Sequence, residues 1–468
     1  MHPSVMDDEL DALAGLGGGS SPGDIAAWLA RLINDGELAP GDRLPTVRAV
    51  ATRLGVSPAT VSQAWQALSR AGLIVSRGRA GSFVRAPDAA WLPPRTQGLA
   101  GYLGEARLDL SRGTPDPLLL PDLSRALARV SASAETSSYH DLPVIPELER
   151  VLREAWPYEA ETITVVDGAL DAVSRALESV LRFGDRVVVE SPGFPPFFDL
   201  VETLGARPIP VALDESGITA TSLSAALGSH PRALILQPRA QNPTGASLSA
   251  GRAEELARVI RSHPHGRDLI VIEDDHSGQI STAADVSLGR WIPDQVVHVR
   301  SFSKSHGPDL RIAALGGPTA LVDPIVARRM LGPGWTSRMV QRILHDLLTD
   351  GQSLDQVTEA RRQYFARQRA VAAALSGWGI EPARSDGINL WVPVHDERSA
   401  VMQLAASGIR VAPGSPFQAT QATDVGARRF VRVTVGLVRS DAADVAAALG
   451  AAALPHPPGA HSLEQRWS

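Results

Sequence analysis

From residue 108 onward, short runs of β-branched and apolar residues alternate with longer amphipathic segments. The runs that predict strands are 163–166, 186–189, 234–236, 269–272 and 296–299. Helical periodicity marks several of the intervening segments, among them 170–181 and 251–261. This alternation predicts a mainly parallel α/β sheet covered by helices on both faces, with ligands bound at the carboxyl ends of its strands.

A chain of 468 residues is long enough for two or three domains. Hydrophobic residues make up 44% and charged residues 21%, as in globular proteins with sizeable cores. There is no cysteine, which excludes disulfides, thiolate metal sites and thiol catalysis. No apolar run reaches the roughly 18 residues of a membrane helix, and no secretory signal is visible. We therefore expect a cytoplasmic protein.

Charge is distributed unevenly along the chain. The net charge is −6, yet residues 21–86 carry eight arginines against four acidic residues. Residues 1–20 contain four acidic residues, no lysine or arginine, and a glycine-rich end, which predicts a disordered tail. A basic module on an acidic protein favours contact with nucleic acid, because neutralising phosphates drives that binding.

Three helices followed by two short strands are predicted within residues 21–86. The first covers 24–35, the second follows Thr46 as N-cap, and the third begins after Ser57 with Pro58 in its first turn. The strands, 73–76 and 82–85, are joined by the basic run 77–81. A short turn between the second and third helices is typical of a helix-turn-helix, and the strands would form a wing.

This module resembles the winged helix-turn-helix of the GntR regulators. The resemblance rests on the run 36–48 (G-x-L-x-P-G-D-R-L-P-T-V-R), on Leu54-Gly-Val-Ser57 and on Gly81-x-Phe-Val84. It implies that the third helix lies in the DNA major groove. The residues it would place against double-stranded operator DNA are Arg48, Ser57, Ala59, Thr60, Gln63, Arg77 and Gly78. For Arg43 and Arg79 we favour phosphate contacts over base reading.

Residues 87–107 contain Pro87, Pro93 and Pro94 and little apolar periodicity, so we expect a semi-extended linker. The α/β domain would then span 108–455, with a large domain at about 145–330 and a small domain built from the flanking segments. Residues 456–468 are expected to form a tail.

The second informative feature is a single lysine. Of 45 Lys and Arg residues only Lys304 is a lysine. An ε-amine can lose its proton and attack a carbonyl, which a guanidinium cannot do. The alternative is that an arginine-biased gene happened to keep one surface lysine. Its neighbours favour a Schiff-base site, because Ser301, Ser303 and Arg311 together suit a phosphate.

Other polar groups follow the predicted strands. Asp274 comes after the strand 269–272 and has the chemistry to hold a pyridinium nitrogen protonated. Asn242, in Asn-Pro-Thr-Gly, has the chemistry to donate to a phenolate oxygen. Gly168 and Ala169 precede a predicted helix, whose first amides form an anion site. Taken singly, such motifs are usually turns, but here their order and spacing accompany the sole lysine.

This ordered set resembles the fold-type I pyridoxal-phosphate aminotransferases. Joined to a GntR winged helix, it resembles the MocR subfamily of transcriptional regulators. The resemblance implies that Lys304 forms the Schiff base with pyridoxal 5'-phosphate and that Asp274 pairs with its ring nitrogen. Further residues would hold the cofactor: Asn242 at the ring oxygen, Phe194 stacked on the ring, and Gly168, Ala169, Ser301, Ser303 and Arg311 at the phosphate. Tyr139 would reach the phosphate of the partner subunit in a homodimer, and Arg432 would bind a substrate or effector carboxylate.

Four positions depart from the family pattern. His276 stands where the family usually has tyrosine, so it would hydrogen-bond the ring oxygen of the cofactor, and we expect it to titrate near neutral pH. Phe194 replaces a usual tyrosine, Leu170 a usually polar residue, and a glycine is missing after Tyr139. We expect cofactor binding to survive these changes, whereas efficient transamination is less expected.

The sequence therefore favours a transcriptional regulator that senses pyridoxal phosphate or an amino compound reacting with it. One alternative is a working aminotransferase with a DNA-binding appendage. Another is a regulator that senses a metabolite without pyridoxal phosphate. Whether each winged helix packs on its own large domain or on that of the partner stays open.

Overall fold

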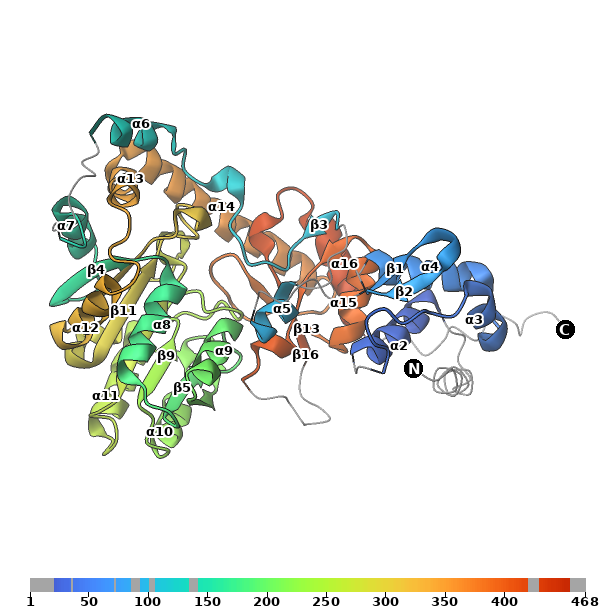
Figure 1. Ribbon diagram of the computed structural model, residues 1–468, viewed down its shortest axis with the longest axis horizontal. Helices are drawn as coiled ribbons and strands as arrows, with labels where there is room; N and C mark the ends of the chain where they lie inside the picture. Colours follow the sequence, from blue (N-terminus) through green and yellow to red (C-terminus); the bar gives the residue numbers. More distant parts are fainter. Residues whose placement is uncertain are drawn as a thin grey trace.

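The computed structural model describes residues 21–34, 37–70, 73–85, 93–100, 106–133, 142–419 and 429–454. The chain is elongated, with the N-terminal module at one end, a small domain in the middle and a large domain at the other end (Figure 1). Among the described residues, no helix combines the length and apolar character needed to span a membrane.

The N-terminal module is a winged helix. Its elements are α2 (Pro22–Asn34), α3 (Val47–Leu54), α4 (Pro58–Arg70), β1 (Ile74–Ser76) and β2 (Ser82–Val84). Thr46 caps α3 by accepting a hydrogen bond from the Ala49 amide at 3.2 Å. Ser57 caps α4 in the same way, with the Thr60 amide at 3.1 Å. These caps stabilise the helix starts by satisfying amides that lack partners within the helix. The predicted helix-turn-helix and wing are confirmed.

A seven-stranded sheet forms the centre of the large domain. In spatial order its strands are β4 (Thr162–Val166), β12 (Ala313–Gly317), β11 (Val296–Ser301), β10 (Ile270–Asp275), β9 (Ala233–Leu236), β5 (Arg186–Glu190) and β6 (Arg207–Val211). Only β12 runs antiparallel to its neighbours within this sheet. The predicted mainly parallel α/β sheet is confirmed.

Apolar side chains point to both faces of this sheet. In β5, Val187 and Val189 join one buried cluster, whereas Val188 joins a second cluster on the opposite face. The first cluster packs against α8 (Ala169–Val180), α9 (Pro195–Thr203) and α12 (Thr319–Met330). The second packs against α10 (Ala220–Leu227) and α11 (Ala250–Ser262). Burial on both faces explains why the strands are continuously apolar in sequence.

The remaining segments extend the large domain and build the small one. At one edge of the sheet α7 (Pro146–Glu154) packs against β4, α13 (Arg338–Thr349) packs against α7, and α6 (Ser124–Ser133) packs against α13. The small domain contains α14 (Gly351–Ser376), β13 (Leu390–Val394), α15 (Glu397–Ala406), β15 (Ala412–Pro413), β16 (Arg429–Val433) and α16 (Ala442–Ala453). It also takes up the start of the α/β region, because β3 (Leu108–Asp109) pairs with β14 (Ile409–Arg410).

The expectation of a semi-extended linker was wrong for part of residues 87–107. Helix α5 (Pro94–Ala100) forms there. Proline suits the first helical position, since it lacks only an amide that would have no partner within the helix. Arg95 then ties the helix to α9 through ion pairs with Asp199 at 3.1 Å and Glu202 at 2.8 Å. Tertiary contacts therefore stabilise a helix that the proline-rich composition argued against.

Candidate functional site

A cavity of about 410 Å³ lies at the carboxyl ends of the parallel strands, facing the small domain. Most of the predicted cofactor residues line it, together with Arg432, the residue predicted to bind a carboxylate: Ala169, Phe194, Asn242, Asp274, His276, Ser301, Ser303, Lys304, Arg311 and Arg432. The first and last of these residues in the sequence, Ala169 and Arg432, are more than 260 positions apart. The sheet brings them together because parallel strands end at a common edge.

Lys304 lies in the turn that follows β11. Its neighbour Phe302 is buried in the core and anchors this turn. The Lys304 ammonium donates a hydrogen bond to the carbonyl oxygen of Gly113 at 2.5 Å. Loss of water around the amine and repulsion by Arg432 lower the pKa of Lys304 to about 8, against an opposing effect of Asp274. The amine thus has an accessible neutral, nucleophilic form.

Asp274 is the penultimate residue of β10, so it lies within the strand rather than after it. Its Oδ2 accepts a hydrogen bond from Gln237 Nε2 at 2.7 Å. Its Oδ1 is buried and has no hydrogen-bond partner. Burial, with a smaller contribution from Asp275, raises the pKa of Asp274 to about 7 against the hydrogen bond from Gln237. A cationic N–H donor placed at Oδ1 would satisfy this carboxylate and lower its pKa again.

The opposite end of the cavity suits an anion. Helix α8 begins at Ala169, so its first amides face this region. The Arg311 guanidinium lies against Gly168, whose φ is +106°, and a Cβ on Gly168 would be 2.7 Å from Arg311 NH2. Ser301 and Ser303 are at the same end, with the Ser303 amide donating to Ser301 Oγ at 3.3 Å. Glycine at 168 therefore leaves room for the guanidinium beside the helix start.

Arg432 is buried in the cavity wall. Its guanidinium donates to Asn242 Oδ1 at 3.2 Å and to the Ser111 carbonyl, and it lies 5.0 Å from the centre of the Phe417 ring. These partners are neutral, and Arg432 Nε has none in the described structure. Burial lowers the pKa of Arg432 only to about 10, so its charge persists at neutral pH. A buried cation with neutral partners is suited to binding a carboxylate.

Phe194 and His276 both line the cavity but lie in different surroundings. Phe194 lines the cavity and packs edge-on against Phe197, with ring centres 5.2 Å apart. The expectation that His276 titrates near neutral pH was wrong. Loss of water and the nearby Lys304 charge lower the pKa of His276 to about 4, so the imidazole is neutral at physiological pH. Leu170 lines the anion end, and Tyr139 lies outside the described residues.

Most of the predicted DNA-facing residues are accessible on the winged helix. Arg48, Ser57, Ala59 and Gln63 are exposed, and Thr60 is half-buried. The Ser57 and Thr60 hydroxyls are 2.8 Å apart at the start of α4. In the wing, the Arg77 guanidinium lies 5.1 Å from the centre of the Phe83 ring, and Gly78 has a φ of +55°.

Two family models match this chain, one for each of its two modules. Residues 23–84 match the family model of bacterial regulatory proteins of the gntR family, and residues 106–449 match that of aminotransferase class I and II. The vitamin B6 salvage pathway transcriptional repressor PtsJ of Salmonella typhimurium is 37% identical over 85% of this chain and 91% of that protein. This chain belongs to the MocR subfamily of GntR transcriptional regulators.

Two further comparisons concern the whole MocR chain and the fold of its large module. The pyridoxine biosynthesis transcriptional regulator PdxR of Corynebacterium glutamicum is 28% identical over 76% of this chain and 79% of that one. The kynurenine aminotransferase of Pyrococcus horikoshii matches the fold with a TM-score of 0.66 and 19% identity, over 75% of this chain and 90% of that structure. The protein is thus a DNA-binding regulator with an aminotransferase-like domain.

The residues of this MocR chain fit the cofactor that the aminotransferase fold implies. Pyridoxal phosphate presents an aldehyde, a pyridine nitrogen, a phenolic oxygen and a phosphate. The cavity offers an amine of lowered pKa at Lys304, an unsatisfied carboxylate oxygen at Asp274, and the anion end at α8 with Arg311. The aldehyde, the ring nitrogen and the phosphate thus each have a complementary group in the wall, and Asn242 lines the same cavity as the residue expected at the phenolic oxygen.

Some residues that line the cavity were not predicted from the sequence. Gln237 orients Asp274, and it was detectable because it follows β9 just as Asn242 does. Gly113, Thr96 and Leu99 also line the cavity, but they come from the linker and the segment after β3. No local motif marks these three, because tertiary packing alone brings them there.

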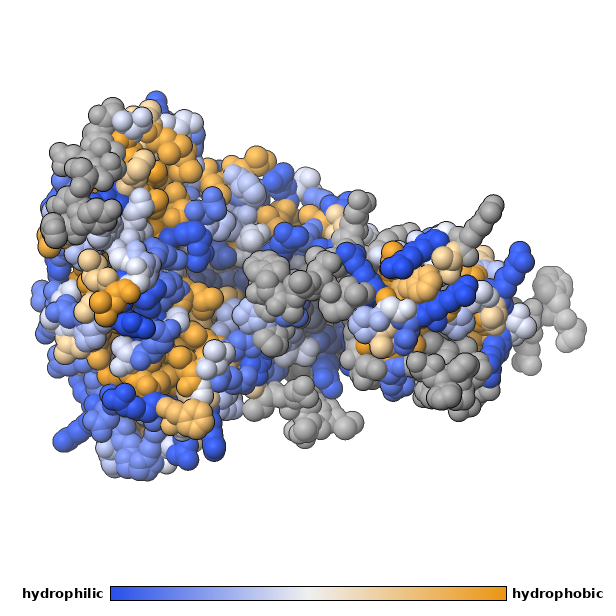
Figure 2. Space-filling view, in the orientation of Figure 1, coloured by the Kyte–Doolittle hydropathy of each residue, from blue (hydrophilic) through white to orange (hydrophobic). Residues whose placement is uncertain are grey.

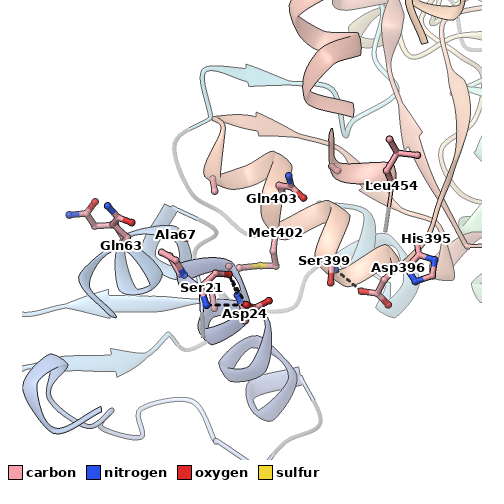
Figure 3. Close-up of a pocket in the computed structure, with 16 residues that line it drawn as sticks. Ser21, Asp24, Gln63, Ala67, His395, Asp396, Ser399, Met402, Gln403 and Leu454 are labelled. Atoms are coloured by element: carbon pink, nitrogen blue, oxygen red, sulfur yellow. Dashed lines mark hydrogen bonds between the residues drawn. The ribbon is translucent and has the colours of Figure 1, made fainter. Parts of the chain in front are cut away.

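The MocR winged helix docks on α15 of the same chain. Met402 of α15 is buried in the core cluster of the winged helix. A second cavity, of about 700 Å³, lies between the two modules beside this contact, with Ser21, Asp24, Gln63 and Ala67 on one side and α15 with neighbouring small-domain residues on the other (Figure 3). Gln63 therefore faces this cavity as well as solvent, so the docked small domain lies close to one residue predicted to contact DNA.

Replacing Met402 with aspartate should detach the winged helix from α15. Burying a methionine side chain contributes about 2 kcal/mol, so its loss shifts the docked-to-undocked ratio by roughly 30-fold. Small-angle X-ray scattering would measure this as a larger radius of gyration. Met330→Asp is a matched control, since Met330 is 45% exposed on α12. An unchanged radius for Met402→Asp would show that docking does not depend on this contact.

Proposed function

We propose that this protein regulates transcription in response to pyridoxal phosphate, which it holds as a Schiff base on Lys304. The observation that carries the proposal is the pairing of a lysine of lowered pKa with an open Asp274 Oδ1 in the same cavity. The names of PtsJ and PdxR, which refer to vitamin B6 and pyridoxine, support the same signal. The sensed molecule is the cofactor or an amino compound that binds beside it.

Each residue has a distinct part in holding this cofactor. When bound, the cofactor supplies an electron-withdrawing ring and an electrophilic carbon. Asp274 would hold the proton on the ring nitrogen, and Asn242 would contact the ring oxygen. The first amides of α8, with Ser301, Ser303 and Arg311, would bind the phosphate. Arg432 would bind the carboxylate of an amino compound, releasing Asn242 from its present hydrogen bond.

Regulation requires that the ligand favours one DNA-binding geometry over another. The winged helix packs on the small domain, so a ligand that shifts the small domain also shifts α4 and the wing. An electrophoretic mobility-shift titration with operator DNA, with and without pyridoxal phosphate, tests the proposal. We expect a change in the dissociation constant for DNA. No specific binding under either condition would contradict it.

We further propose that the protein acts as a homodimer, which would present two winged helices to DNA. Exposed apolar side chains on the large domain support the binding of a second copy of this chain there. Leu127 of α6 is 51% exposed and Met339 of α13 is 44% exposed. Figure 2 shows apolar surface beside these helices. A second copy covering this region would remove apolar surface from water.

A second candidate function is a working aminotransferase, favoured by the presence of Lys304, Asp274 and Arg432 in one cavity. Stopped-flow spectroscopy with amino donors and keto acids distinguishes the two functions. Repeated turnover at metabolic rates would favour the enzyme, whereas a single slow half-reaction would favour the regulator.

The rate of cofactor attachment should depend on pH through Lys304. Only the neutral amine attacks the aldehyde carbon, and water is the leaving group. Because the pKa of Lys304 is about 8, the rate should rise about tenfold per pH unit below pH 8 and level off above it. Stopped-flow absorbance after mixing cofactor-free protein with pyridoxal phosphate measures this profile. A rate that keeps rising to pH 10 would show an unperturbed lysine.

A further inference from the structure

Helix α5 of the linker forms part of the cofactor cavity. Thr96 and Leu99 line it together with Lys304 and Arg432. The same helix lies in the segment that connects the winged helix to the α/β region, with residues 85–93 between β2 and α5. A ligand in the cavity therefore lies beside the segment that leads to the DNA-binding module.

Arg95 ties helix α5 to the large domain. The Arg95 guanidinium makes two hydrogen bonds of 2.8 Å to the Glu202 carboxylate and one of 3.1 Å to Asp199. The Arg95 amide also donates to Asp199, at 3.2 Å. The guanidinium lies 5.4 Å from the centre of the Phe198 ring. Two-point contacts of this kind fix orientation as well as distance.

Helix α9, whose carboxylates pair with Arg95, is itself part of the cavity wall. Helix α9 starts directly after Phe194, and Pro196 and Phe197 in its first turn also line the cavity. The position of α5 is thus tied to the cavity twice, through its own side chains and through α9. A shift of Phe194 against a bound ring would be passed to Asp199 and Glu202 along α9.

On its other side, α5 contacts the small domain. It packs against β15 and against the turn Ser415–Phe417. Strand β15 pairs with β16, where Ala412 lies opposite Arg432. Helix α5 therefore bridges the two domains between which the cavity lies, and any change in their separation must move or strain it.

We propose that α5 is the sensing element of this protein, with Thr96 and Leu99 as ligand-contacting residues and Arg95 as the positioning residue. The inference rests on the proposed function, because it assumes that cavity occupancy changes DNA binding. Leu99 and Thr96 face the bound molecule from the linker, so they would also discriminate between the side chains of amino compounds. The movement of α5 would reach the winged helix through the small domain, since α5 packs against β15, β15 packs against α15, and α15 packs against α2 and α4.

The test uses the full chain and compares two quantities, the affinity for pyridoxal phosphate and the effect of that cofactor on operator binding. In the wild type, we expect the cofactor to change the dissociation constant for DNA by about 5- to 150-fold. Arg95→Ala should bring this ratio to about one while the variant still binds pyridoxal phosphate in an absorbance titration. Arg150→Ala is the matched control, since Arg150 forms an exposed ion pair on α7, with Glu154 at 2.9 Å.

A second measurement follows α5 directly. The chain has no cysteine, so Gln97→Cys provides a single site for a spin label on this helix. Label mobility should change when pyridoxal phosphate is added and should not change in a protein that also carries Lys304→Ala. This readout still applies if Arg95→Ala fails to fold, and Leu99→Ala offers a second variant with less disruption.

The outcomes separate the two proposals. If wild-type operator binding does not respond to pyridoxal phosphate, the proposed function fails and this inference fails with it. If the wild type responds but Arg95→Ala responds equally and the label on α5 does not move, only the inference is overturned. Loss of the response in Arg95→Ala with intact cofactor binding supports α5 as the sensing element.

Discussion

Lys304→Ala should abolish covalent capture of pyridoxal phosphate and remove the effect of that cofactor on operator binding. Alanine has no amine to attack the aldehyde, and no other lysine exists to replace it. We expect the change in the dissociation constant for DNA, about 5- to 150-fold in the wild type, to fall to about one. Borohydride reduction followed by mass spectrometry measures capture, and a mobility-shift titration measures DNA binding.

Because Lys304 is unique, reduction of the wild type can attach the cofactor to one side chain only. The winged helix should remain folded in the variant, since its core cluster consists of its own residues and Met402. Lys304→Arg is the matched control, as it keeps a cation but cannot form a Schiff base. A cofactor response that survives in Lys304→Ala would show that regulation bypasses this lysine.

The fold was predictable because the dominant signals are local and repeated. The strands around Val188, Ile235 and Ile272 are short apolar runs separated by amphipathic helices, and burial on both faces requires this pattern. The start of α4 was predictable for a similar reason. Ser57 and Pro58 act within one helical turn, so their effect does not depend on distant contacts.

The cofactor site was predictable to the extent that it sits on strand ends. Asn242, Asp274 and Lys304 follow or end neighbouring strands, and the sheet topology alone brings them to one edge. The environment of each side chain was not predictable. His276 has its pKa lowered because it lies buried beside Lys304, which no local sequence pattern records.

The linker shows where local reasoning fails. Its prolines argued for an extended chain, but Pro94 starts a helix and Arg95 finds two carboxylates about a hundred residues away. Contacts between residues so far apart along the chain produce no periodic pattern in the sequence. For the same reason, the position of Gln63 beside α15 follows from domain packing and not from the helix-turn-helix pattern.

Asp274→Ala should weaken the binding of pyridoxal phosphate by roughly 10- to 150-fold, the range expected for one buried charged hydrogen bond. The open Asp274 Oδ1 is the acceptor that the ring nitrogen would use. The dissociation constant can be measured by absorbance or fluorescence titration of the cofactor-free protein. Asp294→Ala serves as the control, because Asp294 is exposed at the surface of the same domain.

The effect of Asp274 should also depend on pH in a defined direction. The pKa of Asp274 is about 7 in the cofactor-free protein, and pairing with a cationic ring nitrogen would lower it. The advantage of the wild type over Asp274→Ala should therefore be complete above pH 7 and decrease as the pH falls below 7, where protons compete for the carboxylate. Asp274→Asn keeps the shape without the charge, so its affinity should lie near that of the alanine variant at every pH. Equal affinities of Asp274→Asn and the wild type above pH 7 would show that the carboxylate charge does not hold the ring.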